Sequence, residues 1–161
     1  MSIGTLAGTS VGREAIYEAL FQLLNQQLLS PTGPYLYSSR RRMPASQITT
    51  DNSPAFFLTE EGEIYDRSVL SAPTKVTLLA HVHIISIIND PLAIPAITIN
   101  DLADAVENAI NMNVISTSQQ ILSGLVQEAW INSRQVQSIA TLENRYSEQD
   151  ILLEVILGRS Y

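Results

Sequence analysis

The sequence predicts an α+β fold, in which helices pack on one face of a mostly antiparallel β-sheet. Apolar residues recur at three- and four-residue steps in two stretches, which is the spacing of one helical face. Other stretches are rich in β-branched and aromatic residues and end at Gly, Pro or Asn, as strands do. Helices interrupt the strands only twice, in the order α-β-β-β-α-β-β. The 161 residues are expected to form a single domain.

The first helix is predicted over residues 10–29. Ser10 is expected to cap its N-terminus, because a serine hydroxyl accepts a hydrogen bond from the first turn. Residues 30–34, SPTGP, end the helix because proline cannot donate the next helical hydrogen bond. The first nine residues are mostly small and polar, and we expect them to be flexible. The apolar face of this helix consists of Ile16, Leu20, Leu23, Leu24 and Leu28.

The second helix is centred on Leu102, Val106 and Ile110, which recur at four-residue steps. Asn100 is its expected N-cap, and Asp101 falls in the first turn, where the helix dipole favours acids.

Turn residues separate the predicted strands. Glu61-Gly62 predicts a turn, because glycine tolerates a positive φ. The polar stretch NRYSEQ at 144–149 predicts a loop. The predicted strands cover residues 35–43, 55–60, 75–88, 125–132 and 150–157.

Charge and composition exclude several classes of protein. Nine Lys and Arg face sixteen Asp and Glu, so the net charge of −7 argues against a general nucleic-acid binder. The absence of cysteine excludes disulfide scaffolds and thiolate metal sites. No apolar run approaches the ~20 residues that a membrane span needs, and the N-terminus is not expected to be a secretory signal.

His81 and His83 are the weak candidates for a metal site. Residues two apart on a strand point to the same face, so both imidazoles could reach one ion. A zinc site needs a third protein ligand and usually a fourth, and the sequence offers no second histidine pair to supply them. We therefore expect no metal and no other cofactor.

No other pattern indicates catalysis. Glu60, Glu61 and Glu63 cluster at the predicted turn, where water keeps carboxyl groups acidic rather than raising their pKa. Ser123-Gly124 is not part of a G-x-S-x-G motif, and no glycine-rich phosphate loop occurs. The protein is therefore predicted not to be an enzyme.

Arg40, Arg41 and Arg42 are three of only nine basic residues. On a strand, the outer two would face one way and Arg41 the other. They could contact DNA phosphates, protect an edge strand, or bind an acidic protein surface. We favour a protein interface, in which Glu60, Glu61 and Glu63 of a neighbouring subunit are candidate partners.

Residues 80–88, AHVHIISII, are apolar on both faces of the predicted strand. A half-buried antiparallel strand should alternate more cleanly. Burial of the second face, which carries Leu79, Ile85 and Ile87, by another subunit would explain the pattern. This interpretation predicts an assembly protein.

The order of these segments resembles the tail terminator, or tail completion, proteins of tailed bacteriophages. The resemblance runs from Gly12 to Leu157. The segments that carry it are "GREAIYEALFQLL", the arginine-bearing strand, "SPAFFLTEEGE", "APTKVTLLAHVHIISI", "INDLADAVENAI", "ILSGLVQEAWI" and a final aliphatic strand.

The resemblance implies a homo-hexameric ring that caps the head-proximal end of the tail tube in the virion. Such a ring binds the last ring of tube protein, stops polymerisation, and presents a surface to the head-completion or neck protein. DNA would pass through the lumen without specific binding, and an acidic lumen suits this. Assembly would take place in the host cytoplasm, without a membrane. The alternatives are another ring-forming head–tail connector, a small enzyme using His81 and His83, and a ligand-binding dimer.

Overall fold

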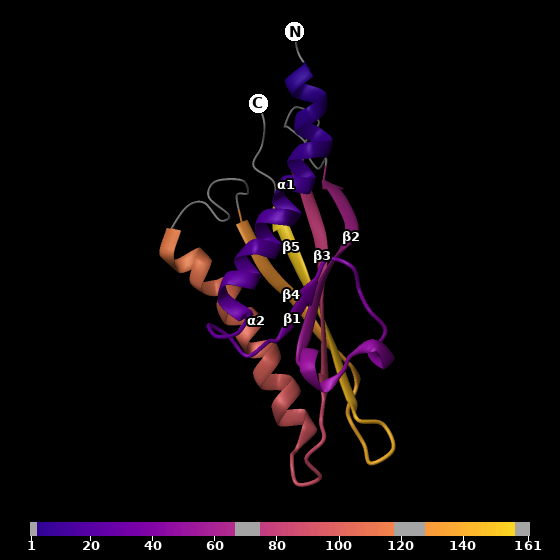
Figure 1. The fold of residues 1–161 in the computed structure, drawn as a ribbon. Helices are drawn as coiled ribbons and strands as arrows, with labels where there is room; N and C mark the ends of the chain where they lie inside the picture. The colour runs from indigo at the N-terminus through magenta and orange to yellow at the C-terminus, as the bar shows by residue number, and fades with distance from the viewer. Residues whose placement is uncertain (1–2, 67–74, 118–127, 157–161) are drawn as a thin grey trace.

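The computed structural model describes residues 3–66, 75–117 and 128–156, and Figure 1 shows their arrangement. Within these ranges, two α-helices and five strands follow one another in the predicted order, which confirms the α+β class. Ser123 and Gly124 lie outside the described residues. The elements are α1 (Ile3–Leu28), β1 (Tyr37–Ser39), the 3-10 turns η1 (Ala45–Gln47) and η2 (Thr50–Asn52), β2 (Ala55–Asp66), β3 (Lys75–Ile87), α2 (Pro95–Thr117), β4 (Glu128–Ser138) and β5 (Tyr146–Ile156).

The strands form one sheet in the order β1-β2-β3-β5-β4. β1 pairs in parallel with β2 over only three residues, from Tyr37↔Ala55 to Ser39↔Phe57. All other neighbours are antiparallel, and β3 pairs along nearly its whole length with β2 and β5. The long, apolar β3 therefore lies in the middle of the sheet, as its sequence predicts.

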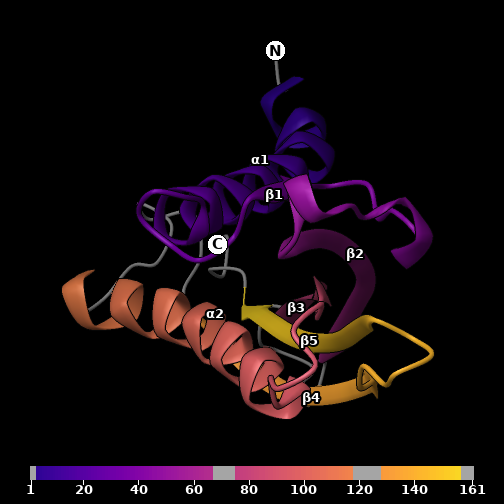
Figure 2. The same ribbon diagram turned by 60° about the horizontal axis from the view of Figure 1, so that its bottom comes forward.

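Both helices cover the same face of this sheet and bury the main core (Figure 2). Leu20 and Leu24 of α1 and Val106 of α2 are fully buried against alternate residues of β3 such as Val82 and Ile84. The Tyr35 hydroxyl donates a hydrogen bond of 2.7 Å to the carbonyl of Leu102, which ties the end of α1 to α2. One apolar residue per helical turn gives each helix an apolar face, and this face packs against the sheet.

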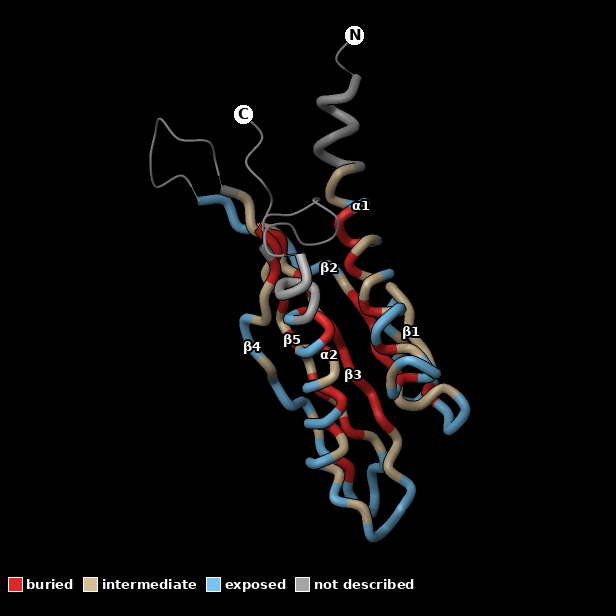
Figure 3. Tube along the Cα trace, turned by 90° about the vertical axis from the view of Figure 1, so that its left-hand side faces the viewer, coloured by how far each residue is buried: buried red, intermediate tan, exposed pale blue. Residues whose placement is uncertain are grey.

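The opposite face of β3 is also buried, but by its own chain. Ile85 is 1% exposed and packs against Ile48 from the connection between β1 and β2. The interpretation that a neighbouring subunit covers Ile85 is therefore wrong, and Ile87 packs against the same cluster. Leu79 lies towards the other end of β3 and is half-buried. Figure 3 shows how far burial extends along β3.

α1 begins at Ile3 rather than at Ser10. Residues 3–9, which the sequence predicts to be flexible, continue the helix, and Ser10 is not a cap. No proline occurs before Pro31, so no residue in this stretch prevents the helix from beginning before Ser10.

Gly33 allows the chain to turn back tightly after α1. A Cβ atom at this position would lie 2.4 Å from the carbonyl oxygen of Leu28, closer than real side chains approach a backbone. The Tyr35 amide then donates a hydrogen bond of 3.0 Å to that same carbonyl. A side chain here would push β1 away from the helix.

β2 does not turn at Glu61-Gly62, as predicted, but continues to Asp66 through a β-bulge. The bulge shifts the register with β3 between Glu60 and Gly62, and Gly62 has a φ of 151°. Glycine here therefore supplies a bulge conformation rather than a hairpin turn.

Other element boundaries also differ from the predictions. α2 begins at Pro95 rather than after Asn100, because proline fits the first helical position, where no amide donor is needed. β5 begins at Tyr146, inside the predicted loop 144–149. Ser147 and Gln149 occupy buried positions of that strand, and this breaks the apolar alternation that would have revealed it.

Candidate functional site

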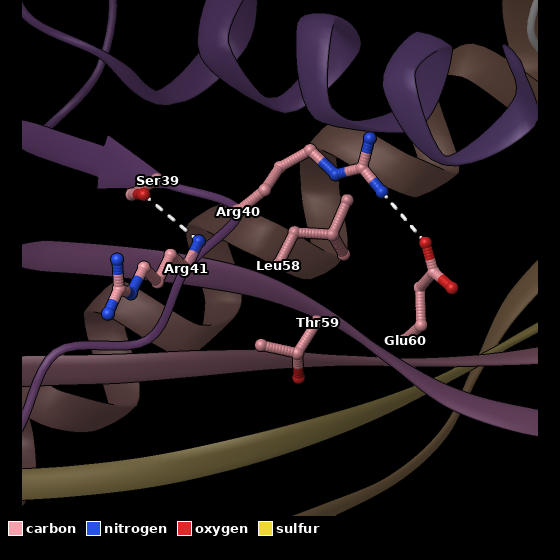
Figure 4. Close-up of a pocket in the computed structure, with 6 residues that line it drawn as sticks. All are labelled: Ser39, Arg40, Arg41, Leu58, Thr59 and Glu60. Carbon is pink, nitrogen blue, oxygen red and sulfur yellow. Dashed lines mark hydrogen bonds and ion pairs between the residues drawn. The ribbon is translucent and has the colours of Figure 1, made fainter. Parts of the chain in front are cut away.

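Arg40 is the centre of a charged network between α1 and β2. It follows β1 directly, and its side chain points back towards the helix (Figure 4). One guanidinium nitrogen lies 2.9 Å from the Glu60 carboxylate and 3.2 Å from that of Glu14, and the other contacts Glu14 and Glu18. One cation thereby holds three carboxylates.

A second ion pair extends the network along β2. Arg13 of α1 pairs with Glu63, and it also donates a hydrogen bond of 3.3 Å to the Tyr65 hydroxyl. Between the two arginines, the Tyr17 hydroxyl donates to the backbone carbonyl of Leu79 at 3.2 Å. Polar side chains therefore join the middle of α1 to both β2 and β3.

The electrostatics of the network follow from these contacts. The hydrogen bond to Glu14 raises the pKa of Arg40, and the hydrogen bond from Arg40 lowers the pKa of Glu14. The hydrogen bond to Glu63 likewise raises the pKa of Arg13. Burial raises the pKa of Tyr17 to about 12, with further contributions from Glu60 and Glu63. Arg13, Arg40 and Glu14 are therefore ionised, and Tyr17 is neutral, at physiological pH.

The three consecutive arginines are not on a strand, because β1 ends at Ser39. Arg40 turns to the helix, while Arg42 pairs with Glu148 of β5 at 3.4 Å. The backbone amide of Arg41 donates to the Ser39 hydroxyl, and its exposed side chain points away from that of Arg40 (Figure 4). The predicted alternation of strand faces is therefore wrong for this segment.

The three glutamates predicted to meet a neighbouring subunit each have a cationic or ionisable partner in their own chain. Glu60 pairs with Arg40, and Glu63 pairs with Arg13. Glu61 lies 3.1 Å from the Nδ1 atom of His81. Their carboxylates remain partly exposed, so contact with another subunit stays a prediction.

His83 belongs to a chain of hydrogen bonds across three strands. Its Nδ1 atom lies 2.5 Å from Asp150 on β5, and its Nε2 atom lies 2.9 Å from the Thr59 hydroxyl on β2. Burial lowers the pKa of His83, although Asp150 opposes this shift. A neutral ring that donates from Nδ1 to Asp150 and accepts from Thr59 satisfies all three groups.

The centroids of the His81 and His83 rings lie 5.4 Å apart. Both nitrogens of His83 already have partners in Thr59 and Asp150. In the part of the chain that the structure describes, no group of three or more His, Asp or Glu side chains could hold a metal ion. The absence of a metal in the working protein stays a prediction.

An exposed apolar surface, which the sequence reasoning missed, lies at one end of the molecule. The β3–α2 and β4–β5 connections lie there together, at the bottom of Figure 1. Leu92 in the first is 90% exposed, and Leu142 in the second is 96% exposed. The Ile88 amide donates to the carbonyl of Arg145 at 2.8 Å, which holds the two connections together. We call this surface the apolar end; it consists of Leu92, Ile94, Ile97, Ile139 and Leu142.

A cavity of about 310 Å³ lies between the two connections of the apolar end, and its wall includes Pro91, Ala93 and Leu142. Neither loop shows the apolar periodicity by which helices and strands are recognised, so no sequence pattern marked them. The only available signal was the presence of leucine next to turn residues, as in Asp90-Pro91-Leu92.

Comparisons with known proteins give similarities to solved structures, but no match of sequence. No family model matches the chain, and no curated protein matches its sequence. A solved structure of a sheath/tube terminator from an extracellular contractile injection system, in its extended state, is similar with a TM-score of 0.39 and 16% sequence identity. The match covers 89% of this chain and 56% of the other, so the chain spans about half the length of that protein.

The described helices were also compared with the requirements of a membrane span. Neither α1 nor α2, over the residues that the structure describes, is both long and apolar enough to cross a bilayer.

Proposed function

We propose that this protein is a structural subunit that caps the end of a bacteriophage tail tube as a ring. The apolar end is the observation that carries the proposal. Two adjoining loops hold leucines that are 90% and 96% exposed, and water-exposed apolar groups gathered at one place mark a docking surface for another protein. A ring that ends a tube needs such a surface at one end of every subunit.

The chemistry of the remaining polar residues favours assembly over catalysis. The buried polar chain Thr59–His83–Asp150 is satisfied internally, and the charged network around Arg40 joins α1 to β2. These groups fix the shape of the subunit. The family resemblance in the sequence supplies the specific role, namely termination of the tail tube and joining to the head.

We further propose that the apolar end binds the last ring of tube protein. Apolar contacts of this kind form the desolvated centre of protein interfaces. The opposite end of the subunit, towards the start of α1, would then face the head or neck. Repetition of the acidic subunit around the ring would give DNA a lumen through which it passes without binding.

Electron microscopy of particles assembled without this protein tests the proposed role. Loss of a terminator is expected to give tubes of uncontrolled length that do not join heads. Loss of a head–tail connector would instead give tails of normal length beside separate heads, and this outcome would contradict the proposal.

Complementation with variants tests the docking surface. The double substitution Leu92→Ser and Leu142→Ser should leave the fold intact, because both side chains are almost fully exposed, but should abolish control of tube length. Leu36→Ser is the matched control, since this leucine is 51% exposed and lies near β1. Normal tails with the double variant would show that the apolar end is not the docking surface.

A further inference from the structure

The outer edge of β2 is an open site for another strand. β1 pairs with only the first three residues of β2, and the chain then bends away at Arg40. Among the described residues, no strand pairs with this edge of β2 from Leu58 onwards. The backbone N–H and C=O groups along this edge can therefore form hydrogen bonds with an added strand.

The surface along this edge is hollowed over the length of several residues. A first hollow of about 480 Å³ is lined by Ser39, Arg41 and Thr59, and Figure 4 shows it where β1 ends. A second hollow of about 460 Å³ follows between α1 and β2, and it is lined by Arg13, Glu14 and Tyr17 of α1 together with Gly62 and Glu63 of β2. Glu60 lines both hollows, so they adjoin at this residue, and we call the two together the groove beside β2.

The other side of the same sheet ends in a second open edge. β4 pairs with β5 on one side, and no described strand lies on the other. It has 11 residues, and the part of β2 beyond its pairing with β1 begins at Leu58 and continues to Tyr65, so the two edges have similar lengths. β4 contains neither the lysine nor the proline that often protects an edge, although two bulges interrupt its pairing with β5.

The two edges differ in charge. Residues 59–66 contain four acidic and no basic residues, whereas β4 has no net charge, since Glu128 and Arg134 are its only charged residues and Arg134 pairs with Asp104 and Glu107 of its own chain. Gln135 and Gln137 of β4 are exposed amides on the face away from the helices, and they can donate hydrogen bonds to the exposed carboxylate of Glu61, which lies on that face of β2. A second copy of this chain therefore presents a suitable strand for the groove.

We infer that β4 of one subunit adds to the outer edge of β2 of the next, so that the sheets of neighbouring subunits join around the ring. Each copy has one edge of each kind on opposite sides of its sheet, and such a heterologous contact closes into a ring when the rotation between copies is right. This inference rests on the proposed ring and specifies how its subunits meet.

Cross-linking in a cysteine-free background tests the inference. The chain has no cysteine, so the double variant Glu61→Cys, Gln135→Cys reacts with a short bismaleimide only at the introduced sites. Assembly is first measured by light scattering and electron microscopy up to millimolar concentration. A ladder of multimers in the double variant, absent from both single variants, is the expected result.

A charge substitution provides an independent measurement. Val136 is 47% exposed on β4, so Val136→Glu should keep the fold by circular dichroism but weaken ring formation about tenfold or more, since it places an acid opposite an acidic strand. Val136→Thr is the matched control and should still form rings, because it changes the same exposed position without adding a charge.

Three outcomes overturn the inference. They are a chain that stays monomeric at millimolar concentration, rings that give no cross-link between the two edges, and cross-linked dimers in the Glu61→Cys single variant, which would show that two β2 edges meet. None of these outcomes decides tube capping, because the particle assay measures tail length directly.

Discussion

The Nδ1 atom of His83 lies 2.5 Å from the Oδ1 atom of Asp150, on the neighbouring strand. The two residues are direct partners in the β3–β5 register, and the same ring contacts Thr59 on β2. Polar atoms so placed in a sheet specify its register, because a slip by one residue would leave them buried without partners.

This arrangement makes stability depend on pH. Burial lowers the pKa of His83 in the folded protein below its ordinary value of 6.5, so the unfolded chain takes up a proton more readily. The stabilising contribution of the neutral ring is therefore fully present above about pH 6.5 and is lost as the pH falls through the folded pKa. Denaturant unfolding between about pH 5 and 7 measures this, with His83→Gln expected to show a flatter slope than the wild type.

His81→Gln is the matched control for this experiment, since its ring lies on the same face of the same strand. Its slope separates the contribution of His83 from the general effect of removing an imidazole from this face of β3. A wild-type slope in the His83→Gln variant would show that other groups cause the pH dependence.

Replacement of Arg40 should destabilise the subunit more than replacement of Arg41. Arg40→Met leaves three carboxylates without their shared cation, and exposed ion pairs contribute about 0.2–1 kcal/mol each, so we expect a loss of about 1 kcal/mol. Arg41 is exposed, and Arg41→Met should change the free energy of unfolding by less than about 0.5 kcal/mol. Urea unfolding at low and high salt measures both variants, and equal losses would contradict the network as the cause.

Removal of divalent metal should leave the protein unchanged. His83 already has partners on both ring nitrogens, and the described side chains form no cluster of three or more metal ligands. Dialysis against a chelator is expected to shift neither the melting temperature nor the oligomeric state. Stoichiometric zinc in purified protein, lost together with stability on chelation, would contradict this expectation.

The sequence predicted the fold class because the long elements have strong apolar periods. β3 could be placed almost to the residue, since Pro73 and Asn89-Asp90-Pro91 bound a continuous β-rich run. β5 was predicted too short because Ser147 and Gln149 are buried polar residues, which look like loop residues to any hydropathy pattern. Segments that are distant in the sequence bury these residues, and a local hydropathy pattern does not show such contacts.

The candidate site was predicted in part, for a similar reason. Charge clustering identified Arg40 and Glu60, but not that they pair within one subunit, because the bend after Ser39 and the position of α1 decide this. Ile85 was assigned to a neighbour because a two-faced apolar strand does not show which segment covers it. The covering residue, Ile48, belongs to an irregular connection with no periodic pattern.

The bulge at Gly62 gives a test of backbone conformation alone. Its φ of 151° disfavours any residue with a side chain, yet a Cβ atom there would meet nothing within 4 Å. Gly62→Ala should therefore destabilise the protein by about 1–2 kcal/mol through backbone strain and not through a clash. Gly12→Ala is the matched control, because this position lies inside α1 with equally open space, and alanine there should stabilise by up to about 1 kcal/mol. Both are measured by thermal unfolding. A neutral or stabilising Gly62→Ala substitution would show that the bulge does not require glycine. The backbone of β2 at residue 62 would then have another conformation.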